Sequence, residues 1–318
     1  MSMKILIIGG GQLGSRHLQA CCLIEQSVEI YVCDPSQDAL DICKIRAEQM
    51  NPHQGIKIYY ISYLSDAAKD INVAIISTNS KVRASVTKEL LSQIKPENIV
   101  FEKFLFPRME EYDSTLKLLK ENGVKAWVNC PRRMFEIYNN IKSEIDSDIT
   151  MSISGSSWGM GSNSIHFIDL FSFLANDSDI RVEAKGLSDE LLSSKRSGYI
   201  ELSGQLNVMS NHSKCKITCE EGDIILPTIQ IDTDKTTYYI NESKKELVKK
   251  DKTSDKEEKT SFTIPFQSGL SNLFVEDIIE KNTCQLTPFE ESANLHKALL
   301  GELLDRYKKG ETASFEIT

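Results

Sequence analysis

Along the first 130 residues, short aliphatic runs alternate with stretches of helical spacing. Residues 5–8 and 73–77 are nearly continuous apolar runs, which are typical of strands buried on both faces. Residues 82–94 and 109–122 repeat apolar positions at the spacing of an amphipathic helix. Further strands are expected at residues 28–33, 56–61, 99–101 and 126–128. Strands that alternate with helices predict a parallel, doubly wound α/β sheet, so residues 1–130 are expected to form a Rossmann-type domain.

The pattern changes near Pro131, where shorter extended segments separated by polar turns replace the alternation. A helix is expected at 134–145, and polar residues 221–223 suggest a hairpin turn. Residues 244–259 are dense in charges of both signs, which favours a solvated hairpin or a mobile loop. Helices are expected at 270–282 and 289–307. The predicted strands are 149–154, 180–186, 199–209, 214–219, 224–232, 236–240 and 260–264. Residues 131–318 therefore predict a second, α+β domain with an open, largely antiparallel sheet, whose C-terminal helix is expected to pack back near the first domain.

A glycine motif follows the first strand at once. Gly9, Gly11 and Gly14 fit the pattern G-x-G-x-x-G, in which each glycine has a mechanical role. The first makes the tight turn, the second allows a pyrophosphate close to the backbone, and the third lets the helix pack on the sheet. A helix that begins near Gln12 and Leu13 would direct its free N–H groups toward the phosphates. Without a ligand, the same pattern is simply a glycine-rich turn.

An acidic residue at the end of the second strand decides between these readings. Asp34 lies 20 residues after Gly14, where a carboxylate accepts hydrogen bonds from a ribose diol and repels a 2′-phosphate. Residues 35–38 offer no arginine or lysine to bind such a phosphate. We therefore expect a dinucleotide site, and NAD rather than NADP.

Ligands of parallel sheets bind beyond the carboxyl ends of the strands. This rule brings a set of polar residues to one rim together with the glycine motif, and we expect them to bind cofactor. They are Asp34, Ser77, Thr78, Asn79, Glu102 and Lys103. Thr78 and Asn79 are expected near the nicotinamide ribose, and Asn129 on the same rim near the substrate.

Hydride transfer from an alcohol also needs a proton acceptor beside the reacting carbon. Lys103 is one candidate, because a cationic nicotinamide ring nearby would disfavour the charged form of this lysine. A surface salt bridge with Glu102 is its structural alternative. His166 is the other, because it follows a glycine-rich loop and shares a helix face with Asp169. A buried structural histidine is its alternative.

Composition excludes several other classes of function. The net charge of −9 argues against general nucleic-acid binding, and no apolar run approaches the length of a membrane span. Eight scattered cysteines without C-x-x-C spacing suggest reduced, packed thiols in a cytoplasmic protein. We expect no metal site.

Together these features resemble the glucose–fructose oxidoreductase / inositol dehydrogenase (Gfo/Idh/MocA) family over essentially the whole chain. His17 follows the glycine motif as in the family, and Glu102-Lys103-Phe104 corresponds to its Glu-Lys-Pro motif. Residues 158–166 correspond to the glycine-rich stretch that leads to Asp-x-x-x-His, and residues 220–224 to a glycine-bearing hairpin. The resemblance implies NAD(P)-dependent oxidation or reduction of a sugar-type alcohol, and a homodimer or homotetramer formed through the open sheet.

The chain departs from the family pattern at two positions. Phe104 replaces the proline of the lysine motif, and Ser162 replaces the acid four residues before His166, with Asn163 one place off. A carboxylate–histidine proton relay is therefore incomplete in the sequence. These departures support an alternative function, in which the protein binds a dinucleotide and a sugar as a sensor or partner subunit without turnover.

Two arginines stand where the predicted domains join. Arg132 and Arg133 follow Asn129, and similar joints in the family contact cofactor or substrate. Guanidinium groups there would suit a carboxylate or phosphate on a sugar, while pairing with acids of the protein is the structural alternative. The expected substrate-binding residues are Asn129, Arg132, Arg133, Ser162, Asn163 and His166, and the expected partner is a sugar, sugar phosphate, sugar acid or nucleotide-linked sugar.

Overall fold

The computed structural model describes residues 2–310 and 313–317, which divide into two compact units. The first unit comprises residues 2–106, 110–129 and 265–289. The second comprises residues 107–109 and 130–264 together with the described residues after 289. The sequence analysis placed one boundary at residue 130, whereas here the chain returns to the first unit at 265–289. The final helix belongs almost entirely to the second unit.

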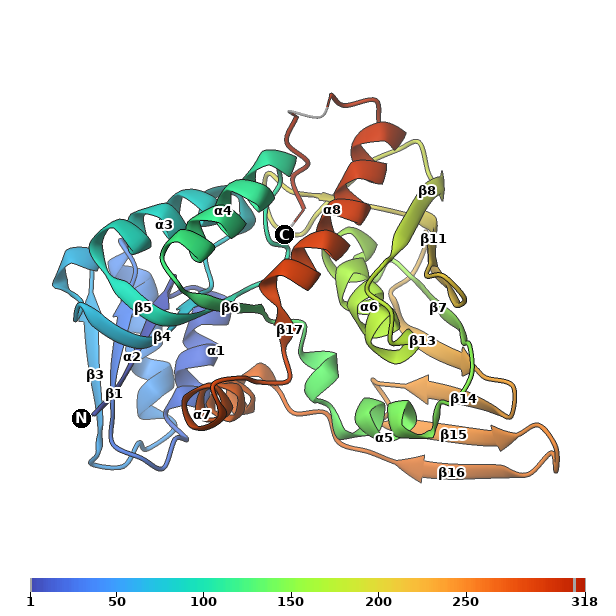
Figure 1. Ribbon diagram of the computed structural model, residues 1–318, viewed down its shortest axis with the longest axis horizontal. Coiled ribbons are helices and arrows are strands. Elements are labelled where there is room, and N and C mark those ends of the chain that lie inside the picture. The colour runs from blue at the N-terminus through green and yellow to red at the C-terminus, as the bar shows by residue number, and fades with distance from the viewer. Residues whose placement is uncertain (1, 311–312, 318) are drawn as a thin grey trace. The chain divides into compact units, whose positions relative to one another are not determined.

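The first unit is a doubly wound parallel sheet, which confirms the predicted fold class. Its strand order is β17-β6-β5-β4-β1-β2-β3, with only the short edge strand β17 antiparallel. Helices α1, α2 and α7 cover one face, and α3 and α4 the other (Figure 1). The strands are β1 (Met3–Ile8), β2 (Val28–Cys33), β3 (Ile56–Ile61), β4 (Asp70–Ile76), β5 (Lys95–Phe101), β6 (Lys125–Val128) and β17 (Thr287–Pro288). The helices are α1 (Gln12–Cys21), α2 (Gln37–Glu48), α3 (Ser80–Gln93), α4 (Met109–Glu121) and α7 (Ser271–Lys281).

Backbone hydrogen bonds bring the predicted rim residues together. At the carboxyl end of the sheet, the residue after each strand donates to the last residue of the neighbouring strand. Ser77 donates to Ile8 at 2.9 Å, Glu102 to Ile76 at 3.0 Å, and Asn129 to Phe101 at 2.8 Å. The ladder therefore extends one residue past the strands, and the polar side chains that follow lie side by side.

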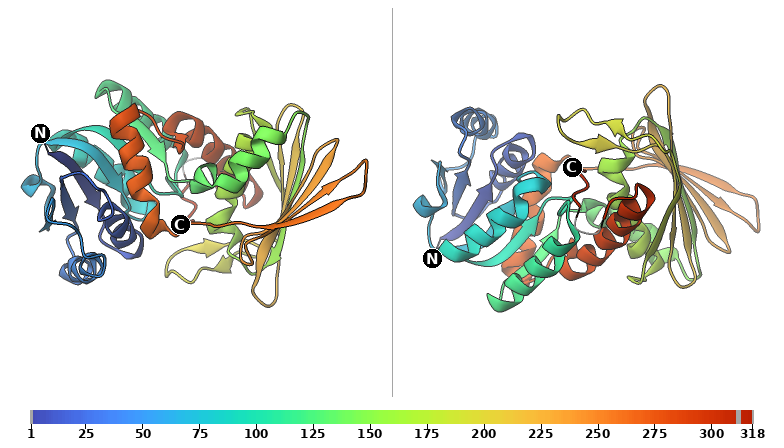
Figure 2. Two further views of the ribbon diagram at one scale, coloured as in Figure 1. Left: turned by 90° about the horizontal axis from the view of Figure 1, so that it is seen from below. Right: turned by 90° about the horizontal axis from the view of Figure 1, so that it is seen from above.

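The second unit is built on an eight-stranded sheet, as predicted largely antiparallel. Its order is β16-β15-β14-β13-β7-β12-β11-β8, and among these neighbours only β7 and β12 run parallel. Helices α5, α6 and α8 lie on one face of the sheet, and the opposite face carries no helix of this unit's described residues (Figure 2). The strands are β7 (Thr150–Ser156), β8 (Arg181–Leu187), β11 (Gly204–Met209), β12 (Lys214–Glu220), β13 (Ile225–Asp232), β14 (Thr236–Asn241), β15 (Glu246–Asp251) and β16 (Glu257–Ser261). The helices are α5 (Glu136–Glu144), α6 (Met160–Ala175) and α8 (Phe289–Arg306), and β9 (Leu192–Ser193) pairs with β10 (Ile200–Glu201) separately.

Several local predictions for the second unit were wrong. Residues 221–223 are not a hairpin turn, because β12 and β13 both pair with β7, which lies between them. Residues 199–209 form two strands, β10 and β11, interrupted at Leu202 and Ser203. The predicted strand at 260–264 is displaced, since β16 ends at Ser261.

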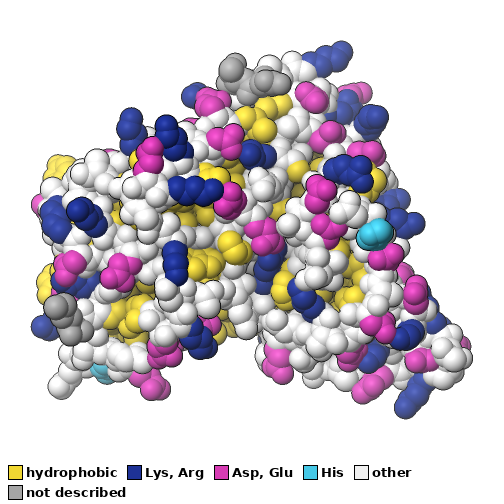
Figure 3. Space-filling model, in the orientation of Figure 1, with side chains coloured by type: hydrophobic (Ala, Val, Ile, Leu, Met, Phe, Trp, Pro, Cys, Tyr) yellow, Lys and Arg dark blue, Asp and Glu magenta, His cyan; other side chains and the backbone are white. Residues whose placement is uncertain are grey.

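The charge-rich segment forms a hairpin, one of its two predicted states. Strands β15 and β16 pair antiparallel, and β15 continues the sheet from β14. The alternating charges become ion pairs, such as Lys259 with Glu246 at 2.9 Å and Lys250 with Asp255 at 2.6 Å. Acidic and basic side chains are likewise interspersed over the face shown in Figure 3.

Two further expectations concern membrane-spanning helices and the cysteines. Among the described helices, none is long and apolar enough to cross a membrane. All eight cysteines are free, and seven are buried. Burial raises the pKa of the Cys22 thiol to about 12, so such thiols stay protonated and act as small apolar side chains.

Candidate functional site

The glycine loop after β1 forms a cradle with one tight side and one open side. A Cβ on Gly14 would lie 1.7 Å from the carbonyl oxygen of Gly9, so α1 packs against the loop as closely as its backbone permits. Gly9 itself has φ +95°, which favours glycine. Gly11 differs, because a Cβ there would meet nothing within 4 Å. The protein leaves this space open, and it is where the motif predicts a pyrophosphate.

Asp34 is fixed at the edge of the cradle. Its Oδ2 accepts from the backbone N–H of Gly10 at 2.7 Å, and its Oδ1 from that of Ser36 at 2.8 Å. Each carboxylate oxygen accepts one of these bonds and retains further lone-pair capacity. The half-buried carboxylate is thus oriented beside the loop with acceptor capacity for a diol.

A cation that the sequence search did not reach lies beside the first turn of α1. Arg46 of α2 donates to Oε1 of Gln12 at 2.8 Å and to the hydroxyl of Ser15. Residues 35–38 offer no basic side chain, whereas α2 brings Arg46 back across α1. Leu13, also predicted to line the site, is 36% exposed in the same turn.

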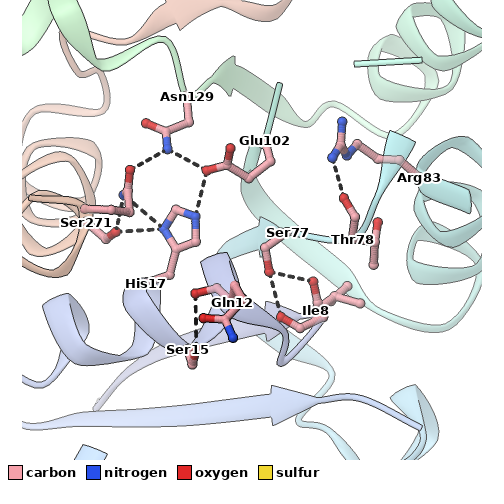
Figure 4. Close-up of polar contacts among 12 residues, drawn as sticks. Ile8, Gln12, Ser15, His17, Ser77, Thr78, Arg83, Glu102, Asn129 and Ser271 are labelled. Atoms are coloured by element: carbon pink, nitrogen blue, oxygen red, sulfur yellow. Dashed lines mark hydrogen bonds and ion pairs between the residues drawn. The ribbon is translucent and has the colours of Figure 1, made fainter. Parts of the chain in front are cut away.

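The rim beyond β4 holds the loop and offers acceptors. The Ser77 hydroxyl lies 2.7 Å from the carbonyl oxygen of Gly9 and 3.0 Å from that of Ile8, and it ties the loop to β4 (Figure 4). Asn79 is exposed at the start of α3. Thr78 Oγ1 and Asn129 Oδ1 are buried and have no hydrogen-bond partner within the described part of the chain. Both were predicted site residues, and a bound ligand with donors would satisfy them.

A closed hydrogen-bond ring lies behind the rim (Figure 4). Buried His17 contacts Glu102 Oε1 through Nε2 at 2.8 Å and the Ser271 hydroxyl through Nδ1 at 2.7 Å. Asn129 donates to the same Glu102 oxygen at 2.6 Å and to Gln267 Oε1 at 2.9 Å. Gln267 completes the ring by donating to Ser271 at 3.0 Å. The sequence analysis did not find Gln267 and Ser271, because they lie about 250 residues from His17 and match no motif.

Glu102 carries a negative charge inside this ring. Burial opposes its ionisation, but hydrogen bonds from His17 and Asn129 and electrostatic interactions with His17 and Lys103 outweigh burial. The pKa of Glu102 is therefore held below its ordinary value. Its side chain turns inward to His17, so a surface salt bridge with Lys103 is not its main role.

Arg83 fixes the backbone that follows Lys103. This arginine of α3 is 2% exposed and donates to the carbonyl oxygens of Phe104 and Leu105, the latter at 3.0 Å. It also donates to the carbonyl oxygen of Thr78 (Figure 4). The Lys103–Phe104 peptide bond is cis. One guanidinium thus joins the turn carrying half-buried Lys103 to the turn carrying Thr78.

In the second unit, His166 lies on the first half of α6 and is half-buried. Ser162, one turn earlier, donates its backbone N–H to Glu201 Oε2 at 3.2 Å, and its hydroxyl donates to Glu201 Oε1. Asn163 instead donates back to the carbonyl oxygen of Gly159 at 3.0 Å. Glu201 comes from β10, and the sequence analysis did not consider it.

Both arginines after Asn129 are paired with acids of their own unit. Arg132 donates to Glu242 at 2.8 and 2.6 Å, and Arg133 donates to Asp169 at 2.9 and 3.0 Å. Arg133 also donates to Glu291 at 2.7 Å. These contacts correspond to the structural alternative for the two residues. They also engage both carboxylate oxygens of Asp169, the residue that shares a helix face with His166.

The predicted residues therefore form two groups, each within one unit. Around the cradle the first unit gathers Gly9, Gly11, Gln12, Leu13, Gly14, Asp34, Ser77, Thr78, Asn79, Glu102, Lys103 and Asn129. The second unit holds Arg132, Arg133, Ser162, Asn163 and His166. Among the described residues, no group of three or more histidine, cysteine or acidic side chains is placed to hold a metal ion.

Comparison with known proteins finds a family model that resembles most of the first unit. A family model described as "Oxidoreductase family, NAD-binding Rossmann fold" (GFO_IDH_MocA) matches residues 3–130. No curated protein sequence matches the chain at a significant level.

Solved structures resemble the chain along nearly its full length. UDP-N-acetylglucosamine 3-dehydrogenase GnnA from Acidithiobacillus ferrooxidans has a TM-score of 0.69 and 10% identity, covering 97% of this chain and 99% of that one. An oxidoreductase from Agrobacterium radiobacter in complex with NAD+, L-tartaric acid and magnesium has a TM-score of 0.70 and 11% identity, covering 99% and 98%. A super-repressor mutant of Gal80p from Saccharomyces cerevisiae has a TM-score of 0.71 and 13% identity, covering 99% and 98%. At such identities the likeness shows a shared fold.

The open side of the cradle predicts different outcomes for two glycines. We expect Gly11→Ala to leave the free energy of unfolding within about 0.5 kcal/mol of the original, because φ is −64° and the added methyl meets nothing. NADH affinity should fall about 10-fold or more, because that methyl occupies the pyrophosphate space. Gly14→Ala should cost about 1–3 kcal/mol of stability or more through its clash with Gly9. Urea unfolding and NADH fluorescence titration measure both, and unchanged affinity in Gly11→Ala would contradict the site.

The lowered pKa of Glu102 predicts a pH dependence of stability. A depressed pKa contributes stability above the ordinary value of 4.5, and this contribution is lost as pH falls through the lower folded value. We expect Glu102→Gln to cost about 1–3 kcal/mol at pH 7. The difference from the original chain should shrink as pH falls from 6 to about 3. Urea unfolding at several pH values measures this, and a difference that stays constant with pH would refute it.

The ion pairs of Arg133 predict a structural penalty in the second unit. Arg133→Met removes the partner of buried Asp169, and we expect a loss of about 3–5 kcal/mol. The control is Lys235→Met, whose ion pair with Asp146 is largely exposed, so this substitution should cost far less stability than Arg133→Met. Chemical unfolding followed by circular dichroism measures both losses. Equal losses would show that Arg133 is not buried as a structural pair.

Proposed function

We propose that the protein is an NAD-dependent dehydrogenase or reductase, because residues 3–130 match the model of the Gfo/Idh/MocA oxidoreductase family. Its proposed substrate is a secondary alcohol, or the matching ketone, of a sugar, sugar phosphate, sugar acid or nucleotide-linked sugar. The observation that carries the proposal is the cradle after β1. Its central glycine leaves an open space, and an oriented carboxylate stands beside it.

The residues present fit a nicotinamide dinucleotide. The backbone N–H groups at the start of α1 and the space at Gly11 suit a pyrophosphate. Asp34 suits a ribose diol and disfavours a 2′-phosphate, which supports NAD over NADP. The buried acceptors of Thr78 and Asn129 suit donors farther along the rim. When bound, such a cofactor accepts or supplies a hydride.

Lys103 is the proposed acid–base group of the first unit. In oxidation, the carbinol C–H bond breaks and its electron pair leaves as hydride. The hydroxyl proton passes to Lys103 Nζ, and the oxygen is left as a carbonyl. In reduction the ammonium returns this proton. The hydrogen-bond ring that includes Glu102 fixes the backbone before Lys103, and the contacts of Arg83 fix the backbone after it. The backbone that carries the Lys103 side chain is therefore held in place.

His166 is the proposed second polar group toward the substrate, where it would orient the hydroxyl or relay its proton. Its support lies in the second unit alone, where it follows the glycine-rich turn at the start of α6. Arg132 and Arg133 have acids as partners, so they give no separate reason for an anionic substrate. GnnA is described as a UDP-N-acetylglucosamine 3-dehydrogenase, which supports a nucleotide sugar by analogy of fold. By the same analogy, L-tartaric acid in the Agrobacterium complex supports a hydroxy acid.

A second candidate function is binding without turnover. Phe104 and Ser162 replace the residues expected in the lysine and histidine motifs. One solved structure of this fold is described as a super-repressor mutant, which supports a regulatory role by analogy. Under this alternative the same cradle would bind the dinucleotide as a signal.

Substituting Lys103 separates the two functions. We expect Lys103→Ala to lower turnover about 100-fold or more, because a positioned proton acceptor contributes a factor of that order. NADH binding should remain within a few-fold, since the cradle is unchanged. Lys88→Ala, at an exposed lysine of α3, is the matched control and should keep both properties. Absorbance at the NADH band is followed with pools of neutral sugars, sugar acids, sugar phosphates and nucleotide sugars.

Two outcomes would overturn the enzymatic proposal. Full activity of Lys103→Ala would remove the assigned role of Lys103. NADH binding by the original chain, with no absorbance change on any sugar class, would favour the sensor.

A further inference from the structure

The first turn of α6 is built around an acidic side chain from another strand. Glu201 ends β10, and both of its carboxylate oxygens accept hydrogen bonds from Ser162. A Cβ on Gly161 would lie 2.9 Å from Glu201 Oε2 and 3.3 Å from Glu201 Cα. The absence of a side chain at Gly161 therefore lets β10 approach the helix.

The position of β10 is fixed independently of this contact. It pairs antiparallel with β9, where Glu201 is opposite Leu192. The backbone N–H of Ile200 donates to the carbonyl oxygen of Glu316 at 2.9 Å. The strand that carries Glu201 is thus fixed by backbone hydrogen bonds. The Glu201 carboxylate lies at the N-terminal, positive end of the 16-residue helix α6.

Ser162 and His166 are four residues apart on α6, so they are neighbours on one helix face. The Cβ atoms of such a pair are roughly 5–6 Å apart, so the carboxylate that Ser162 holds lies about one helical turn from the residue that carries the imidazole. At this separation a carboxylate favours the charged form of a histidine and orients its ring N–H.

We propose that Glu201 is the positioning residue for His166, supplying from β10 a carboxylate to the first turn of α6, where the helix itself carries Ser162. The role of His166 in substrate binding rests on the proposed function, whereas the pairing of the two side chains does not. Glu201 acts on the imidazole and is not itself placed against substrate.

Two other titratable groups near this turn are already paired or neutral. Asp169, three residues after His166 on α6, has both carboxylate oxygens engaged by Arg133. Burial, and to a smaller extent the charge of Glu201, raise the thiol pKa of Cys219 in β12, so this thiol is neutral near pH 7. The test must distinguish this positioning role from a purely structural role, in which Glu201 only caps α6.

The test follows the titration of His166 in the full chain by NMR with histidine-selective ¹⁵N labelling. The His166 signal is assigned by its loss in His166→Gln. We expect Glu201→Gln to lower the titration midpoint of His166 by about 0.5 pH unit or more, because the imidazolium loses a nearby anion. Adding Ser162→Asp to Glu201→Gln returns a carboxylate to the same turn and should restore the midpoint.

Thermal unfolding of the same variants separates capping from positioning. A lower melting temperature in Glu201→Gln with an unchanged His166 midpoint would overturn the proposal and leave Glu201 as a helix cap. If Glu201→Gln does not fold, Ser162→Ala keeps the carboxylate but removes its hydroxyl anchor. That variant should then move the midpoint in the same direction, and an unmoved midpoint would equally overturn the proposal.

The titration requires neither cofactor nor turnover, so it remains decisive if the original chain proves to be inactive. If the original chain is active, Glu201→Gln should lower kcat more than it changes KM, and Ser162→Asp should rescue that loss. Inactivity of the original chain would contradict the proposed function alone.

Discussion

The buried negative charge of Glu102 is the constraint on which the first unit depends. A carboxylate with 3% exposure is stable only where donors and positive charge compensate for lost water, and here they come from distant segments. His17 comes from the helix of the glycine loop, Asn129 from the end of β6, and Gln267 and Ser271 from around α7. A single desolvated charge thereby fixes the mutual positions of the loop, the rim and the segment that returns late in the chain. Lys103 directly follows Glu102 in the chain, so the backbone of this candidate acid–base residue is fixed as well.

Both units use a buried arginine to fix a turn of the chain. Each buries a guanidinium at a turn next to predicted site residues. Arg83 binds three backbone carbonyl oxygens, whereas Arg133 binds two carboxylates. Planar guanidinium groups suit both tasks, because their N–H groups diverge in fixed directions. In each case the arginine stabilises the surrounding chain and leaves recognition of a ligand to other groups.

Sequence patterns correctly predicted the features that depend on residues close together in the chain. The parallel sheet of the first unit followed from the alternation of apolar runs with helices, and the roles of Gly9 and Gly14 followed from their spacing. The pattern failed where partners are distant. Residues 221–223 resemble a hairpin turn locally, but β7 separates the strands on either side. Likewise Ser162 suggested a missing carboxylate, and Glu201 lies 39 residues later on a two-residue strand with no periodicity to reveal it.

The return of residues 265–289 to the first unit has a consequence for how the protein is made. The edge strand β17, helix α7 and two members of the Glu102 ring emerge from the ribosome only after the whole antiparallel sheet. The first unit therefore cannot finish folding as an N-terminal fragment during synthesis, contrary to the usual domain-by-domain order. Until the chain is nearly complete, the nascent Rossmann sheet exposes an unpaired edge at β6 and a buried acid short of its full set of partners. Termination of translation before residue 265 would release a molecule that has the glycine motif but lacks α7, β17 and two members of the Glu102 ring.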